Sequence, residues 1–276
     1  MTFRTCSIAA LLVFTWVGSA EAFDAEQLAK VRQGQACERC DLQEARLKNL
    51  DLKDAKLARS NLVDADLKGA DISRGDLSGA DLRRADLEKS ILRDTRLSGA
   101  NGAGVDMEKS DLSGADLSGA DFRNADIAES QLISVTMVEI DLGGADLKRS
   151  DLSGSDMSRA KLERANLERA ILRGVTLSGA DLTRIEMDRA DLTGARLDGA
   201  NLRNAQLKRA NFTDADLTGA DLTGAVLKRA NLSGANLEGT KGLRARQLED
   251  ACGDSRTRLP DESLVLQECR ATTDDD

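Results

Sequence analysis

The cysteines are the side chains with the most evident potential for chemistry. The chain has five, and removal of a predicted leader that contains Cys6 leaves Cys37, Cys40, Cys252 and Cys269. The C-x-x-C spacing of Cys37 and Cys40 suits a disulfide, a redox pair or half of a metal site. No histidine or second C-x-x-C completes a metal site, and no βαβ pattern surrounds the motif as in redox proteins. Four cysteines in an exported chain indicate disulfides, with three possible pairings.

Carboxylates are abundant but do not single out a catalytic pair. The chain has 48 Asp and Glu residues, and the Asp residues recur at regular intervals. Histidine, the commonest general base, is absent. The sequence contains neither a nucleophile elbow nor a glycine-rich phosphate loop before a helix. We therefore predict that the chain is not an enzyme and that it needs no cofactor and no metal.

Composition limits the possible partners. The chain has 276 residues, a net charge of −9 and a pI near 4.9. This acidity argues against a general nucleic-acid-binding protein, so no nucleic-acid partner is expected. Aromatic residues make up only 2% of the chain, which is few for an ordinary globular core.

The N-terminus has the features of a secretory signal. Arg4 supplies the positive charge, an apolar segment runs from Ile8 to Val17, and Ala20-Glu21-Ala22 forms a cleavage motif. The apolar segment is too short to cross a bilayer, although an uncleaved anchor is the alternative interpretation. We predict a signal peptide at 1–22, export to the bacterial periplasm or medium, and no transmembrane segment after cleavage.

A five-residue repeat occupies most of the chain, and Ala215 to Leu237 shows it clearly. Every fifth position from Leu42 to Leu237 gives 40 central sites, of which 31 are Leu, four Met, two Ile and two Phe; the exception is Gly102. A small residue stands two positions before most centres, and Asp or Asn directly before many of them. Helices and strands have periods of 3.6 and 2.0, so each pentapeptide must be one repeated structural unit.

The tandem A-[D/N]-L-x-x motif resembles the pentapeptide-repeat family. The resemblance implies an all-β solenoid, a right-handed quadrilateral parallel β-helix with four pentapeptides per coil. The central and small residues would point inward and the other three outward. We expect about ten coils and a rod of about 45 Å. Phe122 should lean into the vacancy at Gly102, and the glycines from Asn101 to Gly104 suggest a bent or loosened face.

The resemblance also implies a domain organisation. We expect an N-terminal cap at 23–39 containing a short helix, the β-helix at 40–239, a C-terminal cap at 240–270 and a disordered acidic tail at 271–276. Within the C-terminal cap, the pattern predicts a short helix at 240–251 and a strand at the apolar run 264–266. A long rod separates the two cysteine pairs, so its geometry implies the disulfides Cys37–Cys40 and Cys252–Cys269.

Coils of 20 residues would align certain outward residues in columns. One column, the basic ridge, contains Lys89, Lys109, Glu129, Arg149, Arg169, Arg189, Arg209 and Arg229. Its five arginines are a candidate binding site for an anionic partner; the alternative is a solvated surface neutralised by nearby acids, including a parallel column from Asp66 to Asp146. Ile91, Ile133 and Ile171 share another face and are candidate contacts for a partner or a dimer.

The predicted function is therefore binding. We expect an exported, non-enzymatic scaffold whose outward faces bind a protein or an anionic envelope component, with a homodimer as a further option. The alternative comes from the resemblance: some family members are DNA mimics that bind DNA gyrase, a type II topoisomerase, and protect it from quinolones. That alternative requires a chain that is not exported.

Overall fold

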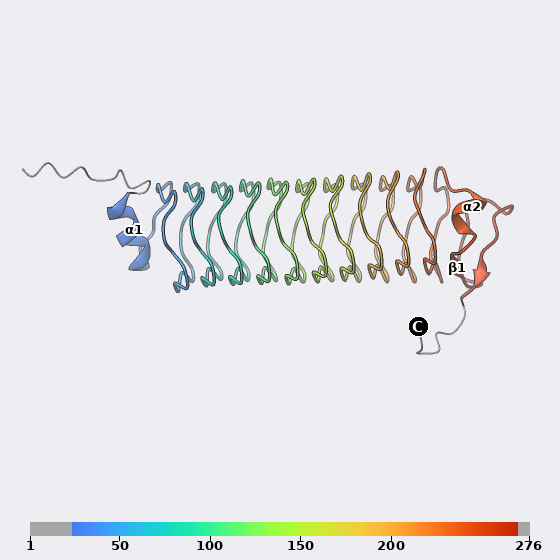
Figure 1. Cartoon of the computed structure of the whole chain (residues 1–276), viewed down its shortest axis with the longest axis horizontal. Helices are drawn as coiled ribbons and strands as arrows, with labels where there is room; N and C mark the ends of the chain where they lie inside the picture. Colours follow the sequence, from blue (N-terminus) through green and yellow to red (C-terminus); the bar gives the residue numbers. More distant parts are fainter. Residues whose placement is uncertain (1–23, 270–276) are drawn as a thin grey trace, which may run out of the picture.

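The chain winds into a rod with a helix at one end and an irregular cap at the other (Figure 1). The structure is a computed structural model that describes residues 24–269. The predicted signal peptide and the predicted acidic tail lie outside these residues. None of the helices within 24–269 is long and apolar enough to cross a membrane.

Each coil contains 20 residues. Parallel β-bridges join residues 20 apart along the rod, from Asp41↔Asn61 to Asp221↔Lys241. In a typical coil, the Leu67 amide donates to the Asp86 carbonyl at 2.7 Å and the Asp86 amide donates to the Ala65 carbonyl at 2.9 Å. Backbone groups of each coil are thus paired with the coils on either side, as burial requires.

A β-turn follows each central residue and explains the five-residue period. The Ala80 amide donates to the Leu77 carbonyl at 2.9 Å, and the third residue of this turn, Gly79, has a φ of +63°. The residue before the centre supports the turn: Asp76 Oδ1 accepts a hydrogen bond from the Ser78 amide at 3.1 Å. Asp and Asn favour this local contact, which gives the A-[D/N]-L-x-x motif a physical cause.

The core is a column of central and small side chains. Leu77 and Ala80 are fully buried, and the same holds for most equivalent positions. Each buried Leu contributes roughly 1.5–3 kcal/mol. Where Ser replaces the small Ala, its hydroxyl is hydrogen-bonded in several coils; Ser150 Oγ donates to the Ile127 carbonyl at 2.7 Å.

Phe122 fills the vacancy at Gly102, as the sequence predicted. A Cβ atom placed on Gly102 would lie 2.8 Å from Phe122 Cε1 and 2.9 Å from Cζ. The predicted bend or loosening is not observed here. The Gly102 amide donates to the Asp121 carbonyl at 2.7 Å, and Asn101 bridges to the coils on both sides, so the ladder continues without a break.

The helix α1 (Ala25–Arg32) covers the first coil. Asp24 caps it by accepting hydrogen bonds from the amides of Glu26 and Gln27. Leu28 and Val31 are buried against the start of the core. The Oε1 atom of Gln27 also accepts a hydrogen bond from the Asp41 amide at 2.6 Å, so α1 replaces a missing coil at this end.

The C-terminal cap is less regular than the sequence suggested. The helix α2 (Ala245–Leu248) has only four residues, whereas the pattern predicted a helix across 240–251. The strand β1 (Cys252–Gly253) pairs in parallel with β2 (Gln267–Glu268), one residue beyond the apolar run predicted as a strand at 264–266. The helix is short because the chain returns to the solenoid: the Cys252 amide donates to the Ala230 carbonyl at 3.0 Å (Figure 1).

Candidate binding surfaces

The basic ridge occupies the third turn position of one face. Its residues have φ values of +57° to +62° and their backbones are therefore left-handed. This conformation costs a non-glycine residue about 1 kcal/mol or more. The other three turn columns contain several glycines each, such as Gly99, Gly114 and Gly144, but the ridge has none from Lys89 to Arg229. Charged side chains therefore stand where glycine would be less strained.

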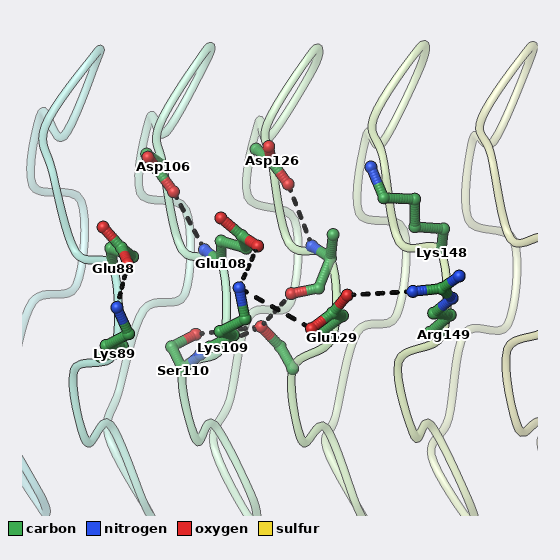
Figure 2. A network of polar contacts seen from close by, with 12 residues as sticks. Glu88, Lys89, Asp106, Glu108, Lys109, Ser110, Asp126, Glu129, Lys148 and Arg149 are labelled. Atoms are coloured by element: carbon green, nitrogen blue, oxygen red, sulfur yellow. Dashed lines mark hydrogen bonds and ion pairs between the residues drawn. The ribbon is translucent and has the colours of Figure 1, made fainter.

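Acidic neighbours neutralise the first half of the ridge, as Figure 2 shows. Lys109 Nζ lies 2.6 Å from Glu108 Oε1 and 3.7 Å from Glu129 Oε2, and Arg149 Nη1 lies 3.3 Å from Glu129 Oε1. Lys89 and Arg169 are similarly paired with the acids that precede them, at 2.5 Å and 3.4 Å. We call these four basic residues the paired half.

The second half of the ridge has no such compensation. The exposed guanidinium groups of Arg189, Arg209 and Arg229 make neither an ion pair nor a hydrogen bond with any residue in 24–269. The acids beside them pair with lysines instead: Asp188 lies 3.8 Å from Lys208, and Asp250 lies 3.6 Å from Lys228. We call these three arginines the unpaired end.

The acidic column beside the ridge has a different role from the one expected. Its Asp residues accept backbone amides two positions later, at 3.0–3.2 Å, and thereby support the turns: Asp66, Asp86, Asp106, Asp126 and Asp146. Among the ion pairs within 24–269, only Asp146 of these five pairs with a basic residue, Lys148, at 3.0 Å. Glu residues neutralise the ridge instead, because they stand closer to it. Glu88, Glu108 and Glu168 directly precede ridge residues, and Glu129 belongs to the ridge itself.

Arg229, the last residue of the unpaired end, directly follows Lys228, which lines a groove at the C-terminal cap. The groove has a volume of about 370 Å³, and its lining includes Val226, Lys228, Arg246, Gln247 and Asp250. It exists because α2 stands where the next pentapeptide of this face would lie. The Nε2 atom of Gln247 donates to the carbonyls of Leu222 and Ala225, both at 2.9 Å, and so holds α2 against the last coil.

The three candidate isoleucines lie on the neighbouring face. Ile91, Ile133 and Ile171 are 37%, 39% and 38% exposed. Ile91 and Ile171 stand directly before a centre, whereas Ile133 stands directly after one. The structure thus brings the three onto one face but not into mutual contact.

The cysteines lie at opposite ends of the rod. Cys37 pairs with Cys40 at a Cα–Cα distance of 5.5 Å, and Cys252 pairs with Cys269 at 4.8 Å. Cys37 and Cys40 are buried. Across 24–269, no group of three or more acidic, cysteine or histidine side chains is arranged to hold a metal ion.

Comparison with known proteins agrees with this architecture. The profile of the family described as Pentapeptide repeats matches the chain repeatedly, over residues 37–79, 80–119, 103–137, 137–174, 170–209 and 205–241. The chain belongs to the pentapeptide-repeat family. Pentapeptide-repeat proteins fold as right-handed quadrilateral β-helices, which agrees with the 20-residue coil.

Two solved pentapeptide-repeat structures are similar to this chain. HetL, involved in heterocyst differentiation regulation in the cyanobacterium Nostoc sp. strain PCC 7120, is 32% identical, with a TM-score of 0.54 over 83% of this chain and 92% of its own. A trypsin-treated variant of QnrB1, a plasmid-mediated fluoroquinolone resistance protein, is 20% identical, with a TM-score of 0.56 over 63% of this chain and 90% of its own. At 20% identity, the similarity to QnrB1 shows the fold alone. A search of curated protein sequences found no match.

The Asp carboxylates of the pentapeptide turns also make the free energy of unfolding depend on pH. Burial by itself would raise the pKa of Asp76, but hydrogen bonds from Arg96 and Ser78 outweigh it and lower the pKa from 3.8 to about 2. The pKa of Asp76 is lower in the folded protein than in the unfolded chain, so ionised Asp76 stabilises the fold. This stabilisation is present above about pH 4 and is lost as the pH falls from about 4 to about 2. We expect Asp76 to contribute on the order of 1 kcal/mol, after allowance for solvent screening.

The Asp76→Asn variant tests this contribution. Its free energy of unfolding should fall below that of the parent at pH 5, and the difference should shrink by pH 2.5. Asp116→Asn is the matched control, since Asp116 accepts the same turn contacts from Ser118 but has no arginine partner in 24–269. Equal pH dependence of the two variants would show that the Arg96 pair contributes nothing.

Proposed function

We propose that this pentapeptide-repeat protein is an exported, non-enzymatic scaffold that binds an acidic protein partner through the unpaired end of its basic ridge. The supporting observation is the uncompensated charge of Arg189, Arg209 and Arg229, in a ridge that has no glycine from Lys89 to Arg229. Guanidinium groups bind carboxylates in a bidentate manner, so a row of three suits an acidic segment.

The spacing along the ridge supports recognition of an extended segment. Successive ridge residues are one coil apart, about 4.8 Å, so the three arginines span about 10 Å. Their charges add to one local positive potential, because no acid of the described chain lies within ion-pair distance of them. This potential contrasts with a chain whose net charge is −9, so an acidic partner would be steered to one end of the rod.

The proposed lack of enzymatic activity and the proposed export rest on separate observations. The many Asp side chains serve the turns, as Asp106 and Asp126 do, and histidine is absent. Export is supported by the signal-like sequence before Phe23 and by the two cysteine pairs at disulfide distance, since disulfides persist in oxidising compartments.

A triple substitution tests the proposed site. We expect Arg189→Ser/Arg209→Ser/Arg229→Ser to weaken binding of a poly(L-glutamate) peptide by about 10- to 100-fold at 50 mM NaCl. Binding is measured by isothermal titration calorimetry, and retention of envelope proteins on the immobilised chain gives a second readout. Because the interaction is electrostatic, binding to the parent should also weaken at 200 mM NaCl.

The paired half provides the matched control. Lys89→Ser/Lys109→Ser/Arg149→Ser removes the same charge from the same left-handed turn position. These side chains already have acidic partners, so the control should bind within about threefold of the parent. Equal losses in both variants would contradict a site confined to the unpaired end and would indicate a response to net charge.

The second candidate is a DNA-mimic protein that binds a type II topoisomerase. The net charge of −9 favours it, whereas the basic ridge and the signal-like N-terminus do not. Cell fractionation separates the two candidates: cytosolic protein that retains Met1 would contradict export. Protection of gyrase supercoiling from a quinolone by the purified chain would then support the mimic.

A further inference from the structure

The face that carries the three isoleucines has the same pattern in both directions along the rod. We call it the isoleucine face. In the column before the centres, the order is Ile91, Asp111, Gln131, Asp151, Ile171. In the column after the centres, the order is Arg93, Ser113, Ile133, Ser153, Arg173. Each column is symmetric about the coil of Gln131 and Ile133, and each step is one 20-residue coil.

The isoleucines project from a flat surface. Ile133 is flanked in its own column by Ser113 and Ser153, and in the turn column by Gly114 and Gly154. These small residues leave Ile133 as a protrusion at the centre of the pattern. Ile91 and Ile171 stand two coils to either side of it, about 10 Å along the rod.

The two arginines of this face are compensated within it. Arg93 Nε lies 2.5 Å from Asp111 Oδ2, and Arg173 Nε lies 2.5 Å from Asp191 Oδ2. The two pairs are four coils apart and have the same geometry. The neighbouring paired half of the ridge is neutralised by its own acids. Little repulsion therefore opposes the approach of a second identical face.

We propose that a second copy of the chain packs against the isoleucine face in an antiparallel orientation. The two-fold axis lies in the interface, across both rods, at the level of Ile133. Rotation about this axis reverses the direction of the rod and places each column of one copy opposite the same column of the other copy. Ile133 then meets the partner's Ile133, and Ile91 meets the partner's Ile171, so the contact is isologous and closed.

A parallel dimer does not produce this match. An axis along the rod over one column would match the isoleucines of that column only and leave the other column without an apolar partner. An axis along the rod midway between the columns would keep each coil level and exchange the two columns. Ile91 would then face the side of the partner that carries Arg93, and each isoleucine would lack an apolar counterpart. The positions of the isoleucines therefore select the antiparallel orientation.

The size of the face suits a weak, reversible dimer. The coils from Asp51 to Asn231 span about 43 Å, and the residues across one face span about 13 Å. Each copy can bury on the order of 600 Å², below the ~800 Å² per partner of a standard stable interface. This surface lies apart from the proposed acidic-partner site, so either proposal can fail without the other.

Cysteine cross-linking of the mature chain tests both contact and orientation. Ile133→Cys should form a disulfide-linked dimer under mild oxidation. A mixture of Ile91→Cys and Ile171→Cys chains should form the mixed dimer. Ile91→Cys alone should not cross-link, because two copies of residue 91 would lie about 19 Å apart, well beyond the ~7 Å Cα separation that a disulfide allows. Efficient cross-linking of Ile91→Cys alone would overturn the antiparallel arrangement.

Sedimentation velocity tests the interface without cross-linking. The parent chain should show a concentration-dependent monomer–dimer equilibrium in the micromolar range, and Ile133→Asp should shift it to monomer by at least tenfold in dissociation constant. Arg123→Asp changes the same turn position on the opposite face of the same coil and should leave dimerisation unchanged. A parent that remains monomeric at 100 µM, or that grows into larger species, would overturn the proposal.

Discussion

Phe122→Ala should reduce the free energy of unfolding by about 3–5 kcal/mol, the largest effect that we expect from a single substitution. The ring of Phe122 occupies its own central position and the space left by Gly102 in the adjacent coil. Its removal therefore opens a cavity that spans two coils, and the fully buried surroundings offer little room for collapse.

A double-mutant cycle shows whether the two positions act as one packing unit. Gly102→Leu alone should destabilise, because even its Cβ would lie 2.8 Å from the Phe122 ring. Phe122→Leu alone should also destabilise, because Leu cannot fill both positions. The double variant Gly102→Leu/Phe122→Leu restores the consensus residue at both sites and should recover most of the loss, with a coupling energy of about 2–3 kcal/mol.

Urea unfolding followed by circular dichroism measures the cycle. Phe212→Leu is the control, because the coils on either side of Phe212 carry Leu192 and Leu232 at the same position. It should cost no more than about 1.5 kcal/mol, as expected for a volume-tolerant apolar exchange. A double variant that is less stable than either single variant would show that Phe122 does not compensate for Gly102.

Loss of the Cys252–Cys269 disulfide should destabilise the C-terminal cap by about 3 kcal/mol. The disulfide closes a loop with a sequence separation of 17, and a loop of this length gives about that value in the chain-entropy model. The disulfide joins β1 to Cys269, the residue after β2, and so reinforces the parallel pairing of the two strands and the hydrogen bond from the Cys269 amide to the Gly253 carbonyl at 3.0 Å. The last coil should therefore fray in the Cys252→Ser/Cys269→Ser variant.

Hydrogen exchange locates this fraying. The amides of Leu232 and Leu237 donate to the cap carbonyls of Cys252 and Arg258, both at 2.8 Å, and should lose protection in the variant. The Cys37→Ser/Cys40→Ser variant is the control, and its effect should be confined to the N-terminal end. Unchanged protection of Leu232 and Leu237 would show that backbone pairing alone holds the cap.

The sequence by itself determined the interior of this protein. A period of five is incompatible with a continuous helix or strand, and the identity of each central residue follows from its need to fill a narrow core. For the same reason the relation between Gly102 and Phe122 could be predicted, since two residues 20 apart on one inward column must share space. The separation of the two cysteine pairs likewise follows from the length of the repeat.

The exterior depended on tertiary structure. The ridge could be listed from the sequence, but the sequence did not show that Arg149 is neutralised and Arg189 is not, because several acids of neighbouring coils compete for each basic side chain. The Asp column seemed suited to pair with the ridge, yet turn geometry directs Asp86 and Asp106 to backbone amides. Whether an acid pairs with a basic side chain or with a backbone amide depends on the length and rotamer of its side chain, which a repeat motif does not encode.

The cap and the isoleucine face show the same limit. The helical pattern after Thr240 extended farther than α2 does, since pairing of Cys252 with the last coil ends the helix early. The symmetry about Ile133 becomes visible only when residues 20 apart are placed side by side as columns of one flat face. The repeat thus determines what is buried, whereas contacts between coils decide which outward side chains are neutralised and which are available to a partner.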